Sequence, residues 1–124
     1  MDAKQIWEEA LKAGAEAGEN AIPTPMTVGS SKSLFGNDID YSKPTYHVSE
    51  GVCGFAWVTI TPARGKMVQY LKSINEGGKG YYGGYQIWVH LNTQSLERKT
   101  AAASAMVDVF QKYGIECHVD SRMD

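Results

Sequence analysis

The feature that most constrains the fold is the last third of the chain, where a strand, a long helix and a second strand follow one another directly. Residues 85–91 place apolar side chains on alternate positions, as a strand with one buried face does. Residues 95–113 carry an apolar stripe at helical spacing, and Gly114 is typical of the residue that ends a helix. Residues 115–120 alternate again. This succession predicts a sheet with a helix packed on it.

The middle of the chain repeats the alternation of strand and helix. Residues 52–61 are predicted to form a central strand and residues 45–48 an antiparallel edge strand. Residues 62–74 are predicted to form a helix, with Thr61 as N-cap and Pro62 in the first turn. Strands joined through a helix are usually parallel. We therefore expect an α/β fold whose small mixed sheet has three parallel strands, one antiparallel edge strand and crossover helices.

The predicted central strand is apolar on both faces. Ala56, Val58 and Ile60 share one face, while Phe55 and Trp57 share the other. Such a strand is covered on both sides, or its second face packs against the N-terminal segment.

Residues 1–20 predict an N-terminal helix with Asp2 as its N-cap. Gly14 and Gly18 each weaken such a helix by about 1 kcal/mol relative to alanine. The helix is therefore expected to depend on docking against the rest of the chain.

The 124 residues are a common length for one domain, so a single domain is expected over 1–124. After the N-terminal helix, residues 21–45 are rich in residues that favour turns and predict an irregular arm. Residues 46–124 then form a ββαβαβ core. An arm this long is either functional or used in assembly, so a homo-oligomer is expected.

Composition narrows the partners and the location. The hydrophobic share of 43% and the charged share of 21% are ordinary for a soluble globular protein. A net charge of −2 supplies no overall basic field, so nucleic acid is not expected as a partner. The sequence has no apolar run of the ~20 residues that a membrane span needs, and its start does not resemble a signal peptide. A cytosolic location is the default.

The cysteines and histidines do not predict a metal or cofactor site. Cys53 and Cys117 are expected to be free thiols, with a disulfide between adjacent strands as the alternative. Together with His47, His90 and His118 they show none of the spacings that bind zinc.

An anion site is the functional prediction. If the three strands are parallel, their carboxyl ends and two helix N-termini lie along one edge of the sheet, where ligands of open α/β folds bind. The predicted ligand-binding residues are Thr61, Arg64, His90, Asn92, Thr93, Gln94, Ser95, Arg98, Lys99, Ser121 and Arg122. These polar and cationic groups suit a phosphate or a carboxylate. In the alternative, Thr61 and Ser95 only cap helices, and Arg98 and Lys99 are solvated.

The glycine-rich residues 76–84 allow a second interpretation. Lys79, Tyr81, Tyr82 and Tyr85 are of the types that stack and hold the bases of a single nucleic-acid strand. The alternative is a flexible linker with packing tyrosines.

Catalysis has little support in the sequence. There is no Gly-x-Ser-x-Gly elbow, and the serine-rich stretch near Gly29 lacks the context of a phosphate loop. His90 could act as a base beside Ser95 or Ser121, but any chain with three histidines allows such a pairing. No catalytic residue is assigned.

Five short segments are specific in combination: PTPM at 23–26, EGVCGFAWV at 50–58, GYQIWV at 84–89, QSLERK at 94–99 and SRMD at 121–124. Through them, nearly the whole chain resembles a family of small proteins encoded by tailed bacteriophages. The resemblance implies a phage origin and a setting in the host cytoplasm, and it does not imply an activity.

The expected function is that of a phage-encoded, non-enzymatic binding protein. It would sequester an anionic small molecule such as a nucleotide, or block a host defence component. One alternative is an interaction or virion structural protein with no small-molecule ligand. Another is a small phosphate-handling enzyme that uses His90.

Overall fold

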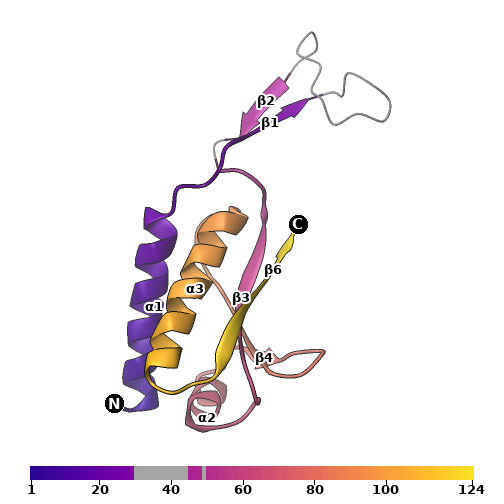
Figure 1. Ribbon diagram of the computed structural model, residues 1–124. Helices are drawn as coiled ribbons and strands as arrows, with labels where there is room; N and C mark the ends of the chain where they lie inside the picture. Colours follow the sequence, from indigo (N-terminus) through magenta and orange to yellow (C-terminus); the bar gives the residue numbers. More distant parts are fainter. Residues whose placement is uncertain (30–44, 49) are drawn as a thin grey trace.

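The structure is a computed structural model, and it describes residues 1–29, 45–48 and 50–124. Most of the predicted irregular arm lies outside the described residues. The elements in chain order are α1 (Ala3–Asn20), β1 (Met26–Gly29), β2 (Thr45–Val48), β3 (Gly54–Ile60), α2 (Lys66–Ser73), β4 (Gly78–Lys79), β5 (Tyr85–Trp88), α3 (Leu96–Lys112) and β6 (Cys117–Met123) (Figure 1).

The main sheet has the strand order β4-β5-β3-β6, and every pair of neighbours is antiparallel. The predicted α/β fold with three parallel strands is therefore wrong. Helix α2 leads from β3 to β4 with β5 between them, and α3 leads from β5 to β6 with β3 between them. Strands joined through a helix thus run in the same direction but are never neighbours. This βαββαβ connectivity is the ferredoxin-like arrangement of an α+β domain.

Strand β2 does not belong to the main sheet. It pairs with β1 in a separate antiparallel ribbon, in which Met26 lies opposite Val48 and Gly29 lies opposite Thr45. The prediction that residues 45–48 form the antiparallel edge of the main sheet is wrong. Strand β3 is hydrogen-bonded to β5 on one side and to β6 on the other, so it has no free edge for β2.

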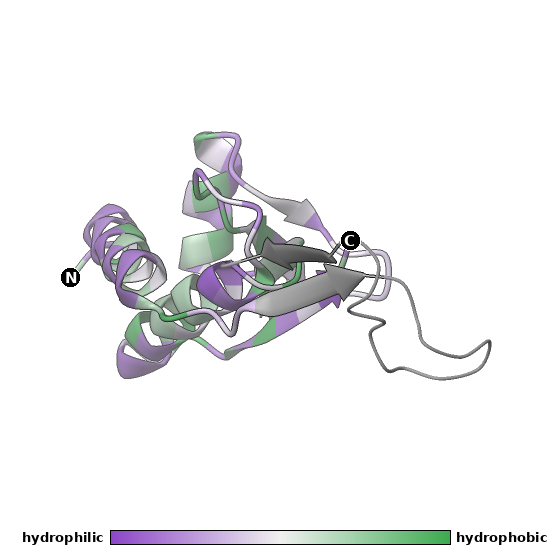
Figure 2. Ribbon diagram, turned by 90° about the horizontal axis from the view of Figure 1, so that it is seen from above, coloured by the Kyte–Doolittle hydropathy of each residue, from purple (hydrophilic) through white to green (hydrophobic). Residues whose placement is uncertain are grey.

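Helices α1 and α3 lie side by side (Figure 1), and glycines allow α1 to pack closely. A Cβ atom on Gly14 would lie 3.0 Å from Met106 Cγ, and one on Gly18 would lie 2.6 Å from Leu91 Cδ1. Asp2 caps α1 as predicted, through a capping box with Gln5. Much of α1 is hydrophilic, purple in Figure 2. The glycines that weaken the isolated helix are thus the positions at which it docks.

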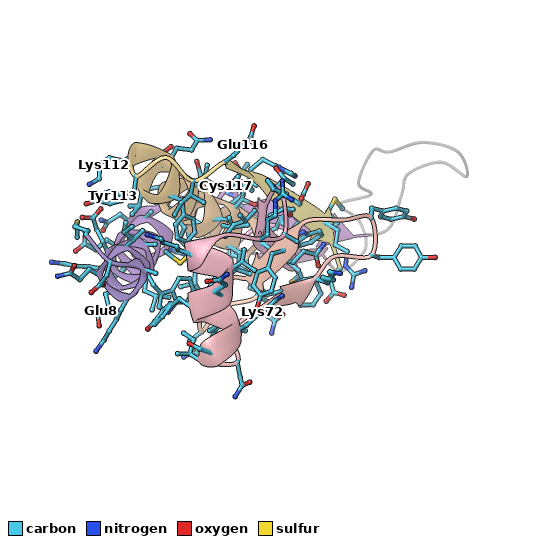
Figure 3. All side chains as sticks on the ribbon, turned by 90° about the horizontal axis from the view of Figure 1, so that it is seen from below. Glu8, Lys72, Lys112, Tyr113, Glu116 and Cys117 are labelled. Carbon is cyan, nitrogen blue, oxygen red and sulfur yellow. The ribbon has the colours of Figure 1, made fainter. Side chains whose placement is uncertain are left out.

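An ion pair joins the same two helices where α3 ends, at Lys112 and beside Tyr113, both labelled in Figure 3. Lys112 Nζ lies 2.7 Å from Glu9 Oε2, and the Tyr113 hydroxyl donates a hydrogen bond of 2.9 Å to Glu9 Oε1. These contacts lower the pKa of Glu9, first through Lys112 and then through Tyr113.

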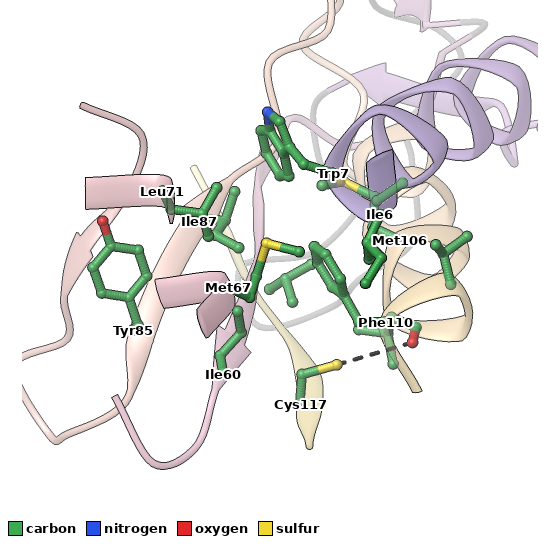
Figure 4. Close-up of a cluster of buried hydrophobic side chains, with 14 of the residues drawn as sticks. Ile6, Trp7, Ile60, Met67, Leu71, Tyr85, Ile87, Met106, Phe110 and Cys117 are labelled. Carbon is green, nitrogen blue, oxygen red and sulfur yellow. Dashed lines mark hydrogen bonds between the residues drawn. The ribbon is translucent and has the colours of Figure 1, made fainter. Parts of the chain in front are cut away.

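The hydrophobic core lies between the three helices and one face of the sheet (Figure 4). Trp7 of α1 stacks on Phe110 of α3, with 6.4 Å between the ring centroids. The largest fully buried apolar side chains are Phe110, Leu71, Ile87, Val58 and Val68. Burial of each such side chain is worth about 1.5–3 kcal/mol, so this core decides on which face of the sheet the helices lie.

Helix α2 begins later than predicted. Thr61 does not cap it, because the Thr61 N–H donates to Glu116 O and its chain segment continues alongside the last strand. The helix begins at Lys66 after Gly65, whose φ of 112° favours glycine.

Among the described residues, no helix has the length and apolar character needed to cross a membrane.

Candidate functional site

The sheet face that points away from the helices carries three aromatic side chains on its two central strands. They are Phe55 and Trp57 of β3 and Trp88 of β5, all half-buried. Trp57 stacks on Trp88 with 4.5 Å between centroids, and Phe55 meets the edge of Trp88 at 5.9 Å. Within residues 1–29, 45–48 and 50–124, no helix packs on this face, because all three contribute to the core on the other side.

Two cations lie over the ring of Phe55. Lys99 Nζ is 4.8 Å from the ring centroid and Arg122 Cζ is 5.6 Å from it, both within the range of cation–π attraction. Arg122 is held there by the register of β6, which places it directly opposite Phe55.

Lys99 is unusual because it is only 6% exposed, yet no carboxylate among the described residues lies within 4.0 Å of it. Its Nζ donates one hydrogen bond of 3.0 Å, to Gly54 O. Buried ammonium groups are normally paired with an acid. Lys99 also belongs to the first turn of α3, where the helix dipole adds partial positive charge. The positive charge at this point is therefore not balanced by a nearby protein carboxylate in the described part of the chain.

A hollow of about 610 Å³ lies next to this cation. Its lining is Phe55, Trp88, Val89, His90, Leu91, Thr93, Gln94 and Lys99. The structure thus brings together four of the predicted ligand-binding residues, His90, Thr93, Gln94 and Lys99, and places Arg122 beside them across the Phe55 ring.

Two predicted residues lie at the opposite end of the sheet. Thr61 and Arg64 follow the carboxyl end of β3, which points away from the carboxyl ends of β5 and β6 because these strands are antiparallel to it. They line a separate cleft of about 630 Å³ beside the beginning of α1. The premise that all three carboxyl ends share one edge was wrong, and these two residues are not part of the hollow.

Two more predicted residues are engaged within the protein. Ser95 is buried, and its Oγ accepts a hydrogen bond of 3.3 Å from the Arg98 N–H, so it caps α3 as the alternative interpretation held. The Arg98 side chain donates to Glu50 and, at 2.9 Å each, to the carbonyl oxygens of Gly18 and Glu19. The hydrogen bond with Glu50 raises the pKa of Arg98.

The remaining two predicted residues do not line the hollow. Asn92 lines a different hollow together with Arg98. Ser121 is exposed and pairs with Ala56, whose side chain lies in the core on the helix side of the sheet.

A polar cluster borders the aromatic face on β6. The Thr59 hydroxyl donates a hydrogen bond of 2.6 Å to Asp120 Oδ2, and His118 Nε2 lies 3.1 Å from the same oxygen. Asp120 stands directly opposite Trp57. The Asp120 carboxylate is therefore engaged by two neighbours.

The sequence-based prediction missed the aromatic residues. The alternation that places Phe55 and Trp57 on one face was visible, but it was interpreted as a face under a cover. The signal for Trp88 was its alternation with Ile87, which points into the core.

Comparison of the chain with protein-family models, with curated proteins and with solved structures finds no match.

Proposed function

We propose that this protein binds an anionic ligand that carries a flat ring, of which a nucleotide is the simplest example. The observation that carries the proposal is Lys99, a buried cation with no carboxylate of residues 1–29, 45–48 or 50–124 within 4.0 Å, at the side of a hollow lined by Phe55 and Trp88. An anion at this position would supply the missing negative charge.

The two parts of such a ligand match two parts of the site. Its ring would stack on the Trp88 surface, beside the Phe55 ring over which the two cations lie, an interaction worth about 1–3 kcal/mol per base. Its phosphate would pair with Lys99 and Arg122, and a hydrogen bond to a charged group contributes roughly 1.5–3 kcal/mol. His90, Thr93 and Gln94 line the same hollow and would donate further hydrogen bonds. Neither part alone would match the whole site.

Binding of this kind needs no catalytic residue. We therefore propose a stoichiometric binding protein, in keeping with the function expected of a phage protein that sequesters a nucleotide in the host cytoplasm. The phage origin, a host partner, the homo-oligomer and the virion and enzyme alternatives stay predictions.

Tryptophan fluorescence tests the proposal, since Trp57 and Trp88 lie at the site. The protein is titrated with adenosine monophosphate, with adenosine and with inorganic phosphate. The monophosphate is expected to bind at least tenfold more tightly than either of its parts, because only it offers both ring and charge. Equal binding of inorganic phosphate would contradict ring stacking, and no response to any of the three would contradict the proposal.

Two matched pairs of variants locate the binding. Lys99→Met replaces the lysine with an apolar side chain of similar length and so removes the charge. This variant is expected to bind the monophosphate at least tenfold more weakly. Lys72→Met, on the exposed side of α2, is its control. Arg122→Ala is expected to act like Lys99→Met, whereas Arg64→Ala, at the other end of the sheet, should leave binding unchanged.

A further inference from the structure

We infer that the ligand of this face is a stretch of single-stranded nucleic acid several nucleotides long, laid across the strands. This inference rests on the proposed function, since it names the substrate class of the same site. It goes further because it requires a second binding area that a free nucleotide does not need.

That second area is a hollow of about 380 Å³ next to the first. Its lining is Gly77, Gly78, Lys79, Gln86, Trp88 and His90. Trp88 and His90 line both hollows, so the two adjoin at these side chains. Together they cross the face from β4 past β5 to the start of β3, and continue to Arg122 on β6.

The width of this path suits several bases. Neighbouring strands lie about 4.8 Å apart, so the three intervals from β4 to β6 span about 14 Å. Bases of one strand are spaced by about 3.4 Å when they stack. A single nucleotide on Trp88 would leave one of the two hollows unfilled.

Charge is distributed in the way that a nucleic-acid backbone requires. Lys79 of the edge strand β4 stands opposite Tyr85 and lines one end of the path, and Lys99 and Arg122 lie at the other. Five acidic residues belong instead to the two long helices on the opposite side of the sheet, namely Glu8, Glu9, Glu16, Glu19 and Asp108. The net charge of −2 argued against nucleic acid, but part of the negative charge is not on this face.

Asp120 also faces the aromatic cluster from β6, but it does not line either hollow. Thr59 and His118 engage its Oδ2, and it lies opposite Trp57 rather than beside the two hollows. The backbone of the ligand would pass Arg122 and Lys99 and avoid Asp120.

Two further aromatic side chains lie just beyond Lys79. Tyr81 and Tyr82, in the turn between β4 and β5, are 92% and 96% exposed and meet each other edge to face. Exposed rings at the end of a basic path offer additional stacking surfaces. Tyr81 and Tyr82 thereby fit the single-strand interpretation of the sequence, whereas Tyr85, at 2% exposure, packs in the core as the linker interpretation expected.

An analogy at the level of the fold agrees with this inference. RNA-recognition domains also use aromatic side chains on a four-stranded antiparallel sheet to stack two or three bases. The analogy supports the ligand class only, because one fold serves many functions.

The experiment compares chain lengths. Thymidine oligonucleotides of one, two, four and eight residues, the uridine octamer and a duplex of eight base pairs are titrated by fluorescence quenching and anisotropy. The thymidine tetramer is expected to bind at least tenfold more tightly than thymidine monophosphate. The duplex is expected to bind at least tenfold more weakly than the octamer, because its bases are not free to stack. The two octamers distinguish DNA from RNA.

Lys79→Met tests the second hollow, with Lys72→Met as its control. It should weaken octamer binding at least threefold and leave monophosphate binding unchanged, since a mononucleotide does not reach Lys79. The slope of log K against log salt should fall in magnitude by about 0.7 in this variant, the value of one single-strand phosphate contact.

The outcomes separate the two proposals. If the monophosphate binds as tightly as the octamer, or if the duplex binds as well as the single strand, the single-strand inference is overturned and nucleotide binding stands. An octamer affinity that Lys79→Met leaves unchanged also overturns it. If neither the monophosphate nor any oligonucleotide binds, both proposals fail.

Discussion

Arg98 Nε lies 2.6 Å from Glu50 Oε2, so a residue in the first turn of α3 holds the segment that leads into β3. The same guanidinium donates to the carbonyl oxygens of Gly18 and Glu19, two of the last residues of α1. Carbonyl groups at a helix end have no partner within the helix, and an arginine can satisfy them. Arg98 therefore ties three segments together and is not free for a ligand.

Arg98→Ala is accordingly expected to lower the melting temperature by several degrees, because α1 loses the group that satisfies its terminal carbonyls. Calorimetry measures the change, and Arg64→Ala is the matched control, expected to leave the melting temperature nearly unchanged. A variant that melts like the parent but binds its ligand more weakly would show that the earlier prediction of Arg98 as a binding residue was right.

Gly54→Ala is expected to destabilise the protein by about 1–3 kcal/mol, the usual cost of overpacking. A Cβ atom at this position would lie 2.5 Å from the carbonyl oxygen of Arg122 in the neighbouring strand. Urea unfolding measures the difference in free energy. Gly78→Ala is the control, because a Cβ atom there would meet no atom within 4 Å. If both variants have the same free energy of unfolding, β3 and β6 do not approach each other closely at Gly54.

The ion pair of Glu9 predicts an acid-sensitive contribution to stability. Lys112 and Tyr113 lower the pKa of Glu9 in the folded state. The stability that the Glu9 carboxylate contributes is therefore present above the pKa of Glu9 in the unfolded chain, and it is lost as pH falls through the lower pKa of Glu9 in the folded protein. Glu9→Gln should therefore reduce stability at neutral pH and have little effect near pH 3. Urea unfolding at several pH values measures this. Glu16→Gln, at an exposed position on the same helix, is the control.

Cys117 predicts a loss of stability in alkali. Both cysteines are free, and burial raises the pKa of the Cys117 thiol from 9.0 to about 11. The stability that the neutral, buried Cys117 thiol contributes is complete below pH 9 and is lost as pH rises towards 11. The loss in free energy of unfolding is on the order of 1–3 kcal/mol. The raised pKa of Tyr85 acts in the same direction, so the comparison must be made with a variant.

Cys117→Val serves for that comparison and should lose less stability than the parent between pH 9 and pH 11. The exposed Cys53 should react with iodoacetamide at pH 8 in the folded protein, while Cys117 reacts only on unfolding. Rapid alkylation of both thiols would contradict the burial of Cys117.

Local patterns determined the two long helices. The N-cap of α1 at Asp2 was predicted correctly, and Ser95 caps α3 as the alternative interpretation held, because a cap depends on residues within one turn of it. The strands of the main sheet were found for the same reason, apart from the two-residue β4. Periodicity also placed Phe55 and Trp57 on one face of β3.

Tertiary structure alone decided which strands are neighbours and which polar groups remain free. The sequence shows that a helix joins β5 to β6, but the insertion of β3 between them arises from non-local hydrogen bonds. That insertion reverses β3 relative to its neighbours and separates Thr61 and Arg64 from the other predicted residues. Likewise, Arg98 and Lys99 are adjacent cations in the sequence, yet one is held by Glu50 while the other is buried beside Phe55. The direction of a side chain and the partners it meets across the fold depend on packing, which no local pattern contains.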